Sequence, residues 1–181
     1  MIPEIKKILF ATDLSKNSAY TFFHAAWMAK YNNASIVILH SIENKGYKGH
    51  EGVPAVLVEK ALIDVNVEEI KKRLRGFYKT TETLTGRPCV ELVAKILVPI
   101  GHPVEEILRA ADEENCDMIV IGTHGKGFLR QTFLGSVAAE VLAKASKPVL
   151  VIPQPAKETL NVNDLPDIRP LTEKMFKEFG Q

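Results

Sequence analysis

The sequence has little cysteine, no excess of charge of one sign and no long apolar run. Its two cysteines, Cys89 and Cys116, are too few for a disulfide framework and lack the CxxC spacing of a zinc or redox site. Lys and Arg number 23 against 22 Asp and Glu, a balance that argues against nucleic acid as the main partner. No stretch approaches the roughly 18 apolar residues of a membrane span, and no signal-peptide core follows Met1. We therefore expect a cytoplasmic protein that binds no membrane, with both cysteines buried in its core.

Short apolar runs alternate with amphipathic segments along the chain. A continuous apolar run is typical of a strand buried on both faces of a sheet. Four such runs occur, at 8–11, 36–39, 118–121 and 149–152, and a more mixed fifth candidate covers 89–98.

Between the predicted strands, apolar residues recur at helical spacing. The four predicted helices cover 19–29, 63–77, 104–111 and 137–145. Ser15 is available as N-cap of the first, and Pro103 suits the first position of the third. This alternation predicts a single α/β domain, an open parallel sheet with helices on both faces.

Two loops carry the polar chemistry. In open parallel sheets, ligands bind beyond the carboxyl ends of the strands, where the strand order reverses. The first predicted strand is followed by Thr12-Asp13-Leu14-Ser15, and the fourth by a glycine-rich loop, 122–127. The amides of Gly135, Ser136 and Val137 are expected to be unpaired at the start of the last helix, where they form an anion site. With the Ser136 hydroxyl and the charges of Lys126 and Arg130, this arrangement suits the phosphates of a nucleotide.

Other nucleotide-binding patterns fit the chain poorly. No Lys-Ser/Thr pair follows the second glycine of a GxxxxG sequence, so there is no Walker A loop. Gly125-Lys126-Gly127 lacks the third glycine of GxGxxG, and the third predicted strand ends at Pro99-Ile100-Gly101 without the aspartate of a response-regulator receiver.

The glycine spacing resembles a known family. Gly122-x-x-Gly125, then nine residues, then Gly135-Ser136 is similar to the nucleotide-binding signature of universal stress proteins, and the similarity covers about residues 4–153. Flanking segments are similar too: Ile8 to Asp13, Leu39-His40, Gly101-His102-Pro103 and Lys147 to Ile152.

This resemblance implies a five-stranded sheet in the order 3-2-1-4-5, a Rossmann-like fold of the adenine nucleotide alpha hydrolase type. It also implies an adenine nucleotide, ATP or else AMP or ADP, as ligand. The cofactor-binding residues implied are Ala11, Thr12, Asp13, Ser41, Ile42, Gly122, Thr123, Gly125, Lys126, Gly127, Gly135, Ser136 and Val137.

Several of these residues also have a plainer interpretation. Asp13 either orients the ribose or phosphates, directly or through Mg²⁺, or merely caps a loop. Ser136 can be an N-cap as well as a phosphate contact. His40, which ends the second strand, is expected to be a satisfied, half-buried histidine, and many relatives have an aliphatic residue where Ser41 stands.

The resemblance implies an ATP-binding stress-response switch or adaptor. Apart from Asp13, the matched loops supply no carboxylate, so we expect at most slow ATP hydrolysis. The alternative is a nucleotide-independent protein-interaction module of the same fold. A small-molecule enzyme is a third possibility, but no nucleophile–base pair is recognisable.

Two segments lie outside the predicted core. The glycine-bearing stretch 43–54 is expected to be a mobile loop. Residues 154–181 form a C-terminal extension to the 1–153 domain, with Leu171, Met175 and Phe179 spaced for a short helix. The last predicted strand, Val149–Ile152, is uncharged, and the resemblance implies a homodimer joined through it. The extension is expected either to reinforce that dimer, to cover its edge, or to be a flexible tail.

Overall fold

The computed structural model describes residues 4–15, 18–43, 54–85, 89–123 and 134–153, and for Ala19 and residues 73–90 within these ranges it describes the backbone alone. The elements follow in the order β1 Lys7–Ala11, α1 Ser18–Asn32, β2 Ser35–Leu39, α2 Ala55–Thr85, the 3₁₀ helix η1 Cys89–Leu92, β3 Val93–Leu97, α3 Pro103–Glu113, β4 Met118–Gly122, α4 Ser136–Lys144 and β5 Val149–Ile152.

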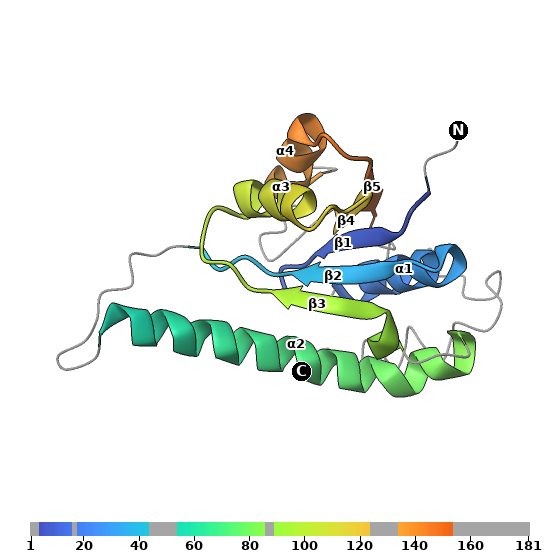
Figure 1. Ribbon diagram of the computed structural model, residues 1–181, viewed down its shortest axis with the longest axis horizontal. Helices are drawn as coiled ribbons and strands as arrows, with labels where there is room; N and C mark the ends of the chain where they lie inside the picture. Colours follow the sequence, from blue (N-terminus) through green and yellow to red (C-terminus); the bar gives the residue numbers. More distant parts are fainter. Residues whose placement is uncertain (1–3, 16–17, 44–53, 86–88, 124–133, 154–181) are drawn as a thin grey trace.

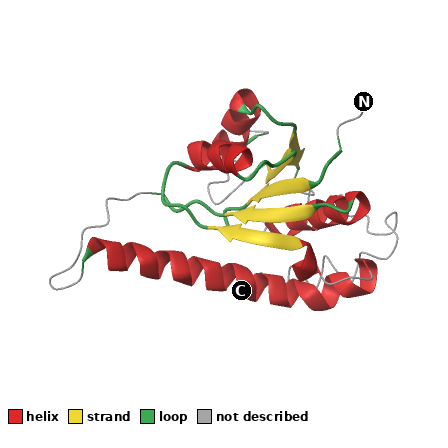
Figure 2. Ribbon diagram, in the orientation of Figure 1, coloured by secondary structure: helices red, strands yellow, loops and turns green. Residues whose placement is uncertain are grey.

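The five strands form one parallel sheet in the order β3-β2-β1-β4-β5 (Figure 1), which confirms the predicted topology. Helices flank the sheet on both sides (Figure 2). Alternate residues of β1 show why the predicted runs are continuous: Ile8 and Phe10 pack in the cluster that includes α1 and α2 residues, whereas Leu9 and Ala11 pack in the cluster of α3 and α4. A strand covered on both faces needs apolar side chains at every position.

The strand predicted at 89–98 is wrong in its first part. Cys89–Leu92 is a 3₁₀ helix, and the strand starts only at Val93. The reason lies in the neighbouring strand: Val93 already pairs with Ile36, one residue from the start of β2, so earlier residues have almost no strand to pair with.

Two helix boundaries also differ from the prediction. α2 spans 31 residues because no proline interrupts it, and the predicted stripe is its sheet-facing side, where Ile70 is buried and Ile63 and Val67 are partly buried. α1 begins at Ser18, so Ser15 does not cap it; the Ser15 carbonyl instead accepts hydrogen bonds from the amide and hydroxyl of Ser18.

At the amino-terminal end of the sheet, Asp117 links the start of β4 to the start of β1. Its Oδ2 accepts hydrogen bonds from the amides of Lys6 and Lys7 at 2.7 and 2.8 Å, and the Lys7 ammonium donates to the carbonyl of Glu114 at 2.8 Å. The neighbouring Cys116 is fully buried, as predicted, and burial raises the pKa of its thiol to about 11. The side chain of Cys89 lies outside the described part. None of the described helices is long and apolar enough to cross a membrane.

Candidate functional site

The carboxyl ends of β1, β2 and β4 meet at one edge of the sheet. Ala11 lies between Leu39 of β2 and Ile121 of β4. The chain beyond β1 stays tied to β2, because the amide of Thr12 donates to the Leu39 carbonyl at 2.9 Å. The loops that begin at Thr12 and at Thr123 therefore leave the sheet side by side, at the point where the strand order reverses.

The loop after β1 forms a tight turn that orients Asp13. The hydroxyl oxygen of Thr12 accepts from the Leu14 amide at 3.1 Å, and Asp13 Oδ1 accepts from the Ser15 amide at 3.0 Å. Leu14 has φ 58°, a left-handed conformation that costs a residue with a side chain some strain. Asp13 Oδ2 is buried, and no residue in the described part of the chain is hydrogen-bonded to it.

Ser15 has a different role from the predicted one. Its hydroxyl is buried and likewise has no hydrogen-bond partner among the described residues. Because buried polar atoms are usually paired, the Ser15 hydroxyl and Asp13 Oδ2 are candidate groups for binding a ligand or ion. The sequence pattern predicted only a helix cap at Ser15. Whether the hydroxyl is buried depends on the residue at which α1 begins, and the pattern did not predict that residue correctly.

His40 holds the start of the loop that follows β1. The residue is buried, and its Nδ1 lies 2.8 Å from the carbonyl oxygen of Thr12, to which it donates a hydrogen bond. The prediction of a satisfied histidine is confirmed, with deeper burial than expected. Its ring links the end of β2 to the start of the Asp13 loop.

Beyond β2, Ser41 and Ile42 are held by the segment that follows β3. The amide of Ile42 donates to the Pro99 carbonyl, the Gly101 amide donates to the Ile42 carbonyl, both at 2.9 Å, and Ser41 Oγ donates to the Gly101 carbonyl at 2.9 Å. The Ser41 hydroxyl is thus engaged by backbone. A Cβ at Gly101 would come within 2.4 Å of Glu106 Oε1, so a side chain there would displace the Glu106 carboxylate.

The start of α4 lies against the end of β4. The amide of Gly135 donates to the Thr123 carbonyl at 2.6 Å, and Thr123 in turn donates from its amide to the Ile152 carbonyl. The expectation that the Gly135 amide is unpaired is therefore wrong, because this bond closes the loop. Gly135 is also the N-cap and Ser136 the first helical residue, so Ser136 does not act as the cap.

The next two amides of α4 lie in its first turn, at the carboxyl end of β4. Ser136 and Val137 occupy the first two helical positions, whose amides have no acceptor within an α-helix. The positive end of the helix dipole adds to their attraction for an anion. The loop residues Gly125, Lys126 and Gly127, with His124 and Arg130, lie outside the described residues, as does most of the predicted loop 43–54.

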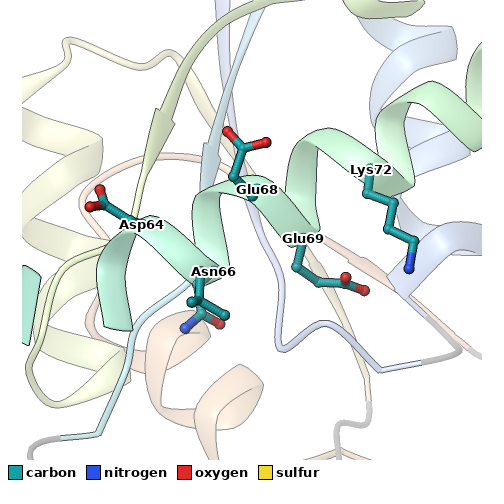
Figure 3. Close-up of a pocket in the computed structure, with 6 residues that line it drawn as sticks. Asp64, Asn66, Glu68, Glu69 and Lys72 are labelled. Atoms are coloured by element: carbon teal, nitrogen blue, oxygen red, sulfur yellow. The ribbon is translucent and has the colours of Figure 1, made fainter. Parts of the chain in front are cut away.

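A hollow of about 580 Å³ lies along α2, and every described residue that lines it belongs to that helix (Figure 3). Among the described residues, no group of three or more His, Cys, Asp or Glu side chains could hold a metal ion on its own. A cation at Asp13 would depend on further ligands, such as phosphate oxygens.

Comparisons with known proteins agree with this architecture. Residues 4–153 match the model of the universal stress protein family. The universal stress protein MJ0577 of Methanocaldococcus jannaschii is 31% identical over 155 residues, covering 81% of this chain and 94% of the relative. The solved structure of MJ0577 superposes with a TM-score of 0.60 at 32% identity, over 84% of this chain and 98% of that one.

Two further structures share the fold at lower identity. UspA from Lactobacillus plantarum has a TM-score of 0.64 at 21% identity, over 83% of this chain and 99% of that one. A universal stress protein solved in complex with cAMP has a TM-score of 0.54 at 19% identity, over 83% of this chain and 98% of that one. At these identities the similarity shows the fold alone.

Proposed function

The chain belongs to the universal stress protein family, and from this premise we propose that it binds an adenine nucleotide, ATP in the first place, in the crevice beyond β1 and β4. In this proposal the protein is a cytoplasmic stress-response switch or adaptor whose state depends on the bound nucleotide. The nucleotide-binding domain is residues 1–153, and residues 154–181 are an extension to it.

One observation carries the proposal: the Asp13 loop and the first turn of α4 lie at the same strand-order reversal. Ala11 pairs with Ile121, and the Gly135–Thr123 hydrogen bond holds α4 against the end of β4. Phosphates at this position would accept hydrogen bonds from the Ser136 and Val137 amides and from the Ser136 hydroxyl. Gly135, with no side chain, leaves the backbone open to close approach.

Asp13 supplies the second recognition element. Its Oδ1 is held by the Ser15 amide, so the carboxylate has a fixed orientation while Oδ2 is left for a ligand. A ribose hydroxyl could donate to Oδ2. The same oxygen fits Mg²⁺, which usually takes one or two carboxylates together with phosphate oxygens and water. When bound, Mg²⁺ would neutralise phosphate charge beside the carboxylate.

Ser41 and Ile42 form the candidate adenine wall. The Ser41 side chain is turned to the Gly101 carbonyl, and the Ile42 amide and carbonyl are bonded to Pro99 and Gly101, which leaves the Ser41 backbone and the exposed part of the Ile42 side chain to contact a flat base. A protein of this fold has been solved with cAMP, so the fold can hold an adenine nucleotide. Gly122, Thr123, Gly125, Lys126 and Gly127 complete the proposed binding set.

We expect a binding protein rather than a fast catalyst. Hydrolysis needs a group that orients or deprotonates water beside the γ-phosphate, and Asp13 is the only carboxylate in the matched loops. A steady-state ATPase rate in the range of about 1–100 s⁻¹, typical of kinases, would contradict this part of the proposal. The competing function is a nucleotide-independent interaction module of the same fold.

Thermal unfolding separates the two functions. A ligand at a hundredfold excess over its Kd adds about 2.7 kcal/mol to the free energy of unfolding. For a domain of this size, MgATP should therefore raise Tm by about 5–11 °C. The double variant Gly125→Val, Gly135→Val should lose the shift and remain folded, whereas Ser146→Val, beyond the far end of α4, should retain it. No shift of the native chain with millimolar ATP, ADP or AMP would favour the interaction module.

Assembly through β5 is a further part of the proposal. β5 is an edge strand, its residues Val149, Leu150 and Val151 are only partly buried, and it carries no charge. An apolar edge of this kind favours pairing with a second copy, so we expect a homodimer. Light scattering of the full chain measures its mass in solution.

A further inference from the structure

The outward side of α2 carries a row of apolar residues at one helical spacing. Leu57, Ala61 and Val65 follow at i, i+4 and i+8, and all three are exposed; Leu57 is 53% and Val65 67% exposed. We call these three residues the outer row. The sheet-facing side of the same helix is a separate stripe, formed by Ile63, Val67 and Ile70. No residue in the described part of the chain covers the outer row.

The outer row runs into the hollow along α2. Val65 lines it together with its polar neighbours and with polar residues of the next two turns, which Figure 3 shows projecting from the helix; the lining residues are Asp64, Val65, Asn66, Glu68, Glu69 and Lys72. α2 lies at the β3 side of the molecule, away from α3 and α4 (Figure 1). The apolar row and the hollow thus form one continuous surface on a single helix.

The chain itself contains a segment that matches this surface. Leu171, Met175 and Phe179 are also spaced at i, i+4 and i+8, and Pro170 suits the first position of a helix that carries them. When the i, i+4 ridges of two helices fit into each other's grooves, the helices pack in the commonest class of helix contact. The small side chain of Ala61 leaves room for Met175 at the centre of such a contact. A helix this short is unstable alone in water and needs an apolar partner.

The connection is long enough to reach. The 18 residues 154–171 can span about 60 Å when fully extended. The width of the sheet from β5 to β3 is four strand spacings, about 19 Å. Tethering also holds the segment at an effective concentration in the millimolar range, so a weak contact suffices.

We infer that residues 170–179 dock as an amphipathic helix on the outer row of α2 in the same chain. This surface lies on a different element from the nucleotide crevice and from β5, so the inference stands or falls independently of the proposed function. It places the extension on α2 rather than on the dimer edge.

Hydrogen exchange of the full chain, read by mass spectrometry, tests the contact from both sides. Met175→Glu puts a charge into the apolar row of the tail and should speed exchange of α2 peptides covering 57–65 by about tenfold. Lys177→Glu, on the opposite side of the same predicted helix, should leave them unchanged. Reciprocally, Val65→Glu should speed exchange of peptides within 170–179, whereas Lys60→Glu, exposed but outside the outer row, should not.

A pair of opposite charges across the proposed contact should restore the protection that Val65→Glu removes. Val65→Glu combined with Met175→Lys should restore most of the protection lost in Val65→Glu alone, which a general loss of stability would not allow. Circular dichroism checks that each variant remains folded; Val65 is exposed, so its replacement should not unfold the domain.

Three results would overturn the inference. Residues 170–179 could exchange in the native chain as fast as an unstructured peptide. The α2 peptides could be indifferent to Met175→Glu. Protection of 57–65 could rise with protein concentration between about 1 and 100 μM, which would mean that a second copy, not the same chain, covers the outer row.

Discussion

Two aspartates stand at opposite ends of β1, and their surroundings differ. Asp117, at the amino-terminal end, accepts two backbone amides on a single oxygen, from Lys6 and Lys7. Asp13, at the carboxyl end, accepts one amide on Oδ1 and leaves Oδ2 buried without a partner among the described residues. Both side chains are fixed by backbone hydrogen bonds, but of the two only Asp13 has an oxygen that is buried without a partner in the described part of the chain.

This difference separates a residue that stabilises the fold from one that can recognise a ligand. A carboxylate oxygen that accepts two backbone amides holds the ends of two strands together. A buried oxygen without a partner is costly unless something supplies a donor or a cation. We therefore expect the two aspartates to respond oppositely to substitution: one in ligand affinity, the other in stability.

The largest expected effect is on nucleotide affinity at Asp13. Asp13→Ala should weaken MgATP binding by about 10- to 100-fold, because a hydrogen bond to a charged group is worth about 1.5–3 kcal/mol. The nucleotide-induced rise in Tm should shrink accordingly, while the stability of the free protein changes by less than about 1 kcal/mol. Titration calorimetry and thermal unfolding measure both quantities.

Asp13→Asn is the matched control for the cation. It keeps an oxygen acceptor but removes the negative charge, so it should bind ATP without Mg²⁺ about as well as the native chain does and gain less from added Mg²⁺. Unchanged MgATP affinity in Asp13→Ala would remove Asp13 from the site.

The next largest effect is on stability at Asp117. Asp117→Ala leaves the Lys6 and Lys7 amides without their acceptor and should lower the free energy of unfolding by about 1–3 kcal/mol. Urea denaturation measures it. The rise in Tm with MgATP should match that of the native chain, since Asp117 lies at the other end of the sheet. If Asp117→Ala were as stable as the native chain but failed to bind nucleotide, the proposed distinction between the two ends of β1 would be wrong.

The smallest expected effect concerns Cys116, beside Asp117. Because burial raises the pKa of this thiol to about 11, little thiolate forms at pH 8, and iodoacetamide should modify Cys116 only after unfolding in urea. Mass spectrometry of the peptide measures the modification. The sign for stability follows: the unfolded thiol ionises near pH 9 and the folded one does not, so the protein should lose stability as pH rises from about 9 toward 11. Cys116→Ala should reduce that loss.

The sequence predicted the alternation of elements well and their boundaries less well. Continuous apolar runs marked β1, β2, β4 and β5 because strands covered on both faces have no polar positions. The 3₁₀ helix at Cys89–Leu92 could not be predicted, since it depends on where β2 starts. The strand order came from the family resemblance and not from any pattern in the chain.

For the site, the sequence indicated which loops matter but not how their polar atoms are used. Gly135 was predicted to offer its amide, yet that amide closes the loop onto Thr123. Ser15 was predicted to cap a helix, yet its hydroxyl lies buried near Asp13. Such assignments depend on the three-dimensional path of the backbone, which decides whether a donor meets a neighbouring carbonyl or an open space.

The two borders of the sheet are chemically unequal. β5 presents only aliphatic side chains, whereas β3 has an exposed Lys95, held by an ion pair with Glu114 at 2.5 Å, and an irregular register with β2 between Ile36 and Val37. A charged, irregular border resists the addition of another strand. Any association through β5 should therefore stop at a dimer. Since only one edge strand of each molecule favours pairing, the sheets cannot join edge to edge into an open-ended filament, even when the protein is abundant.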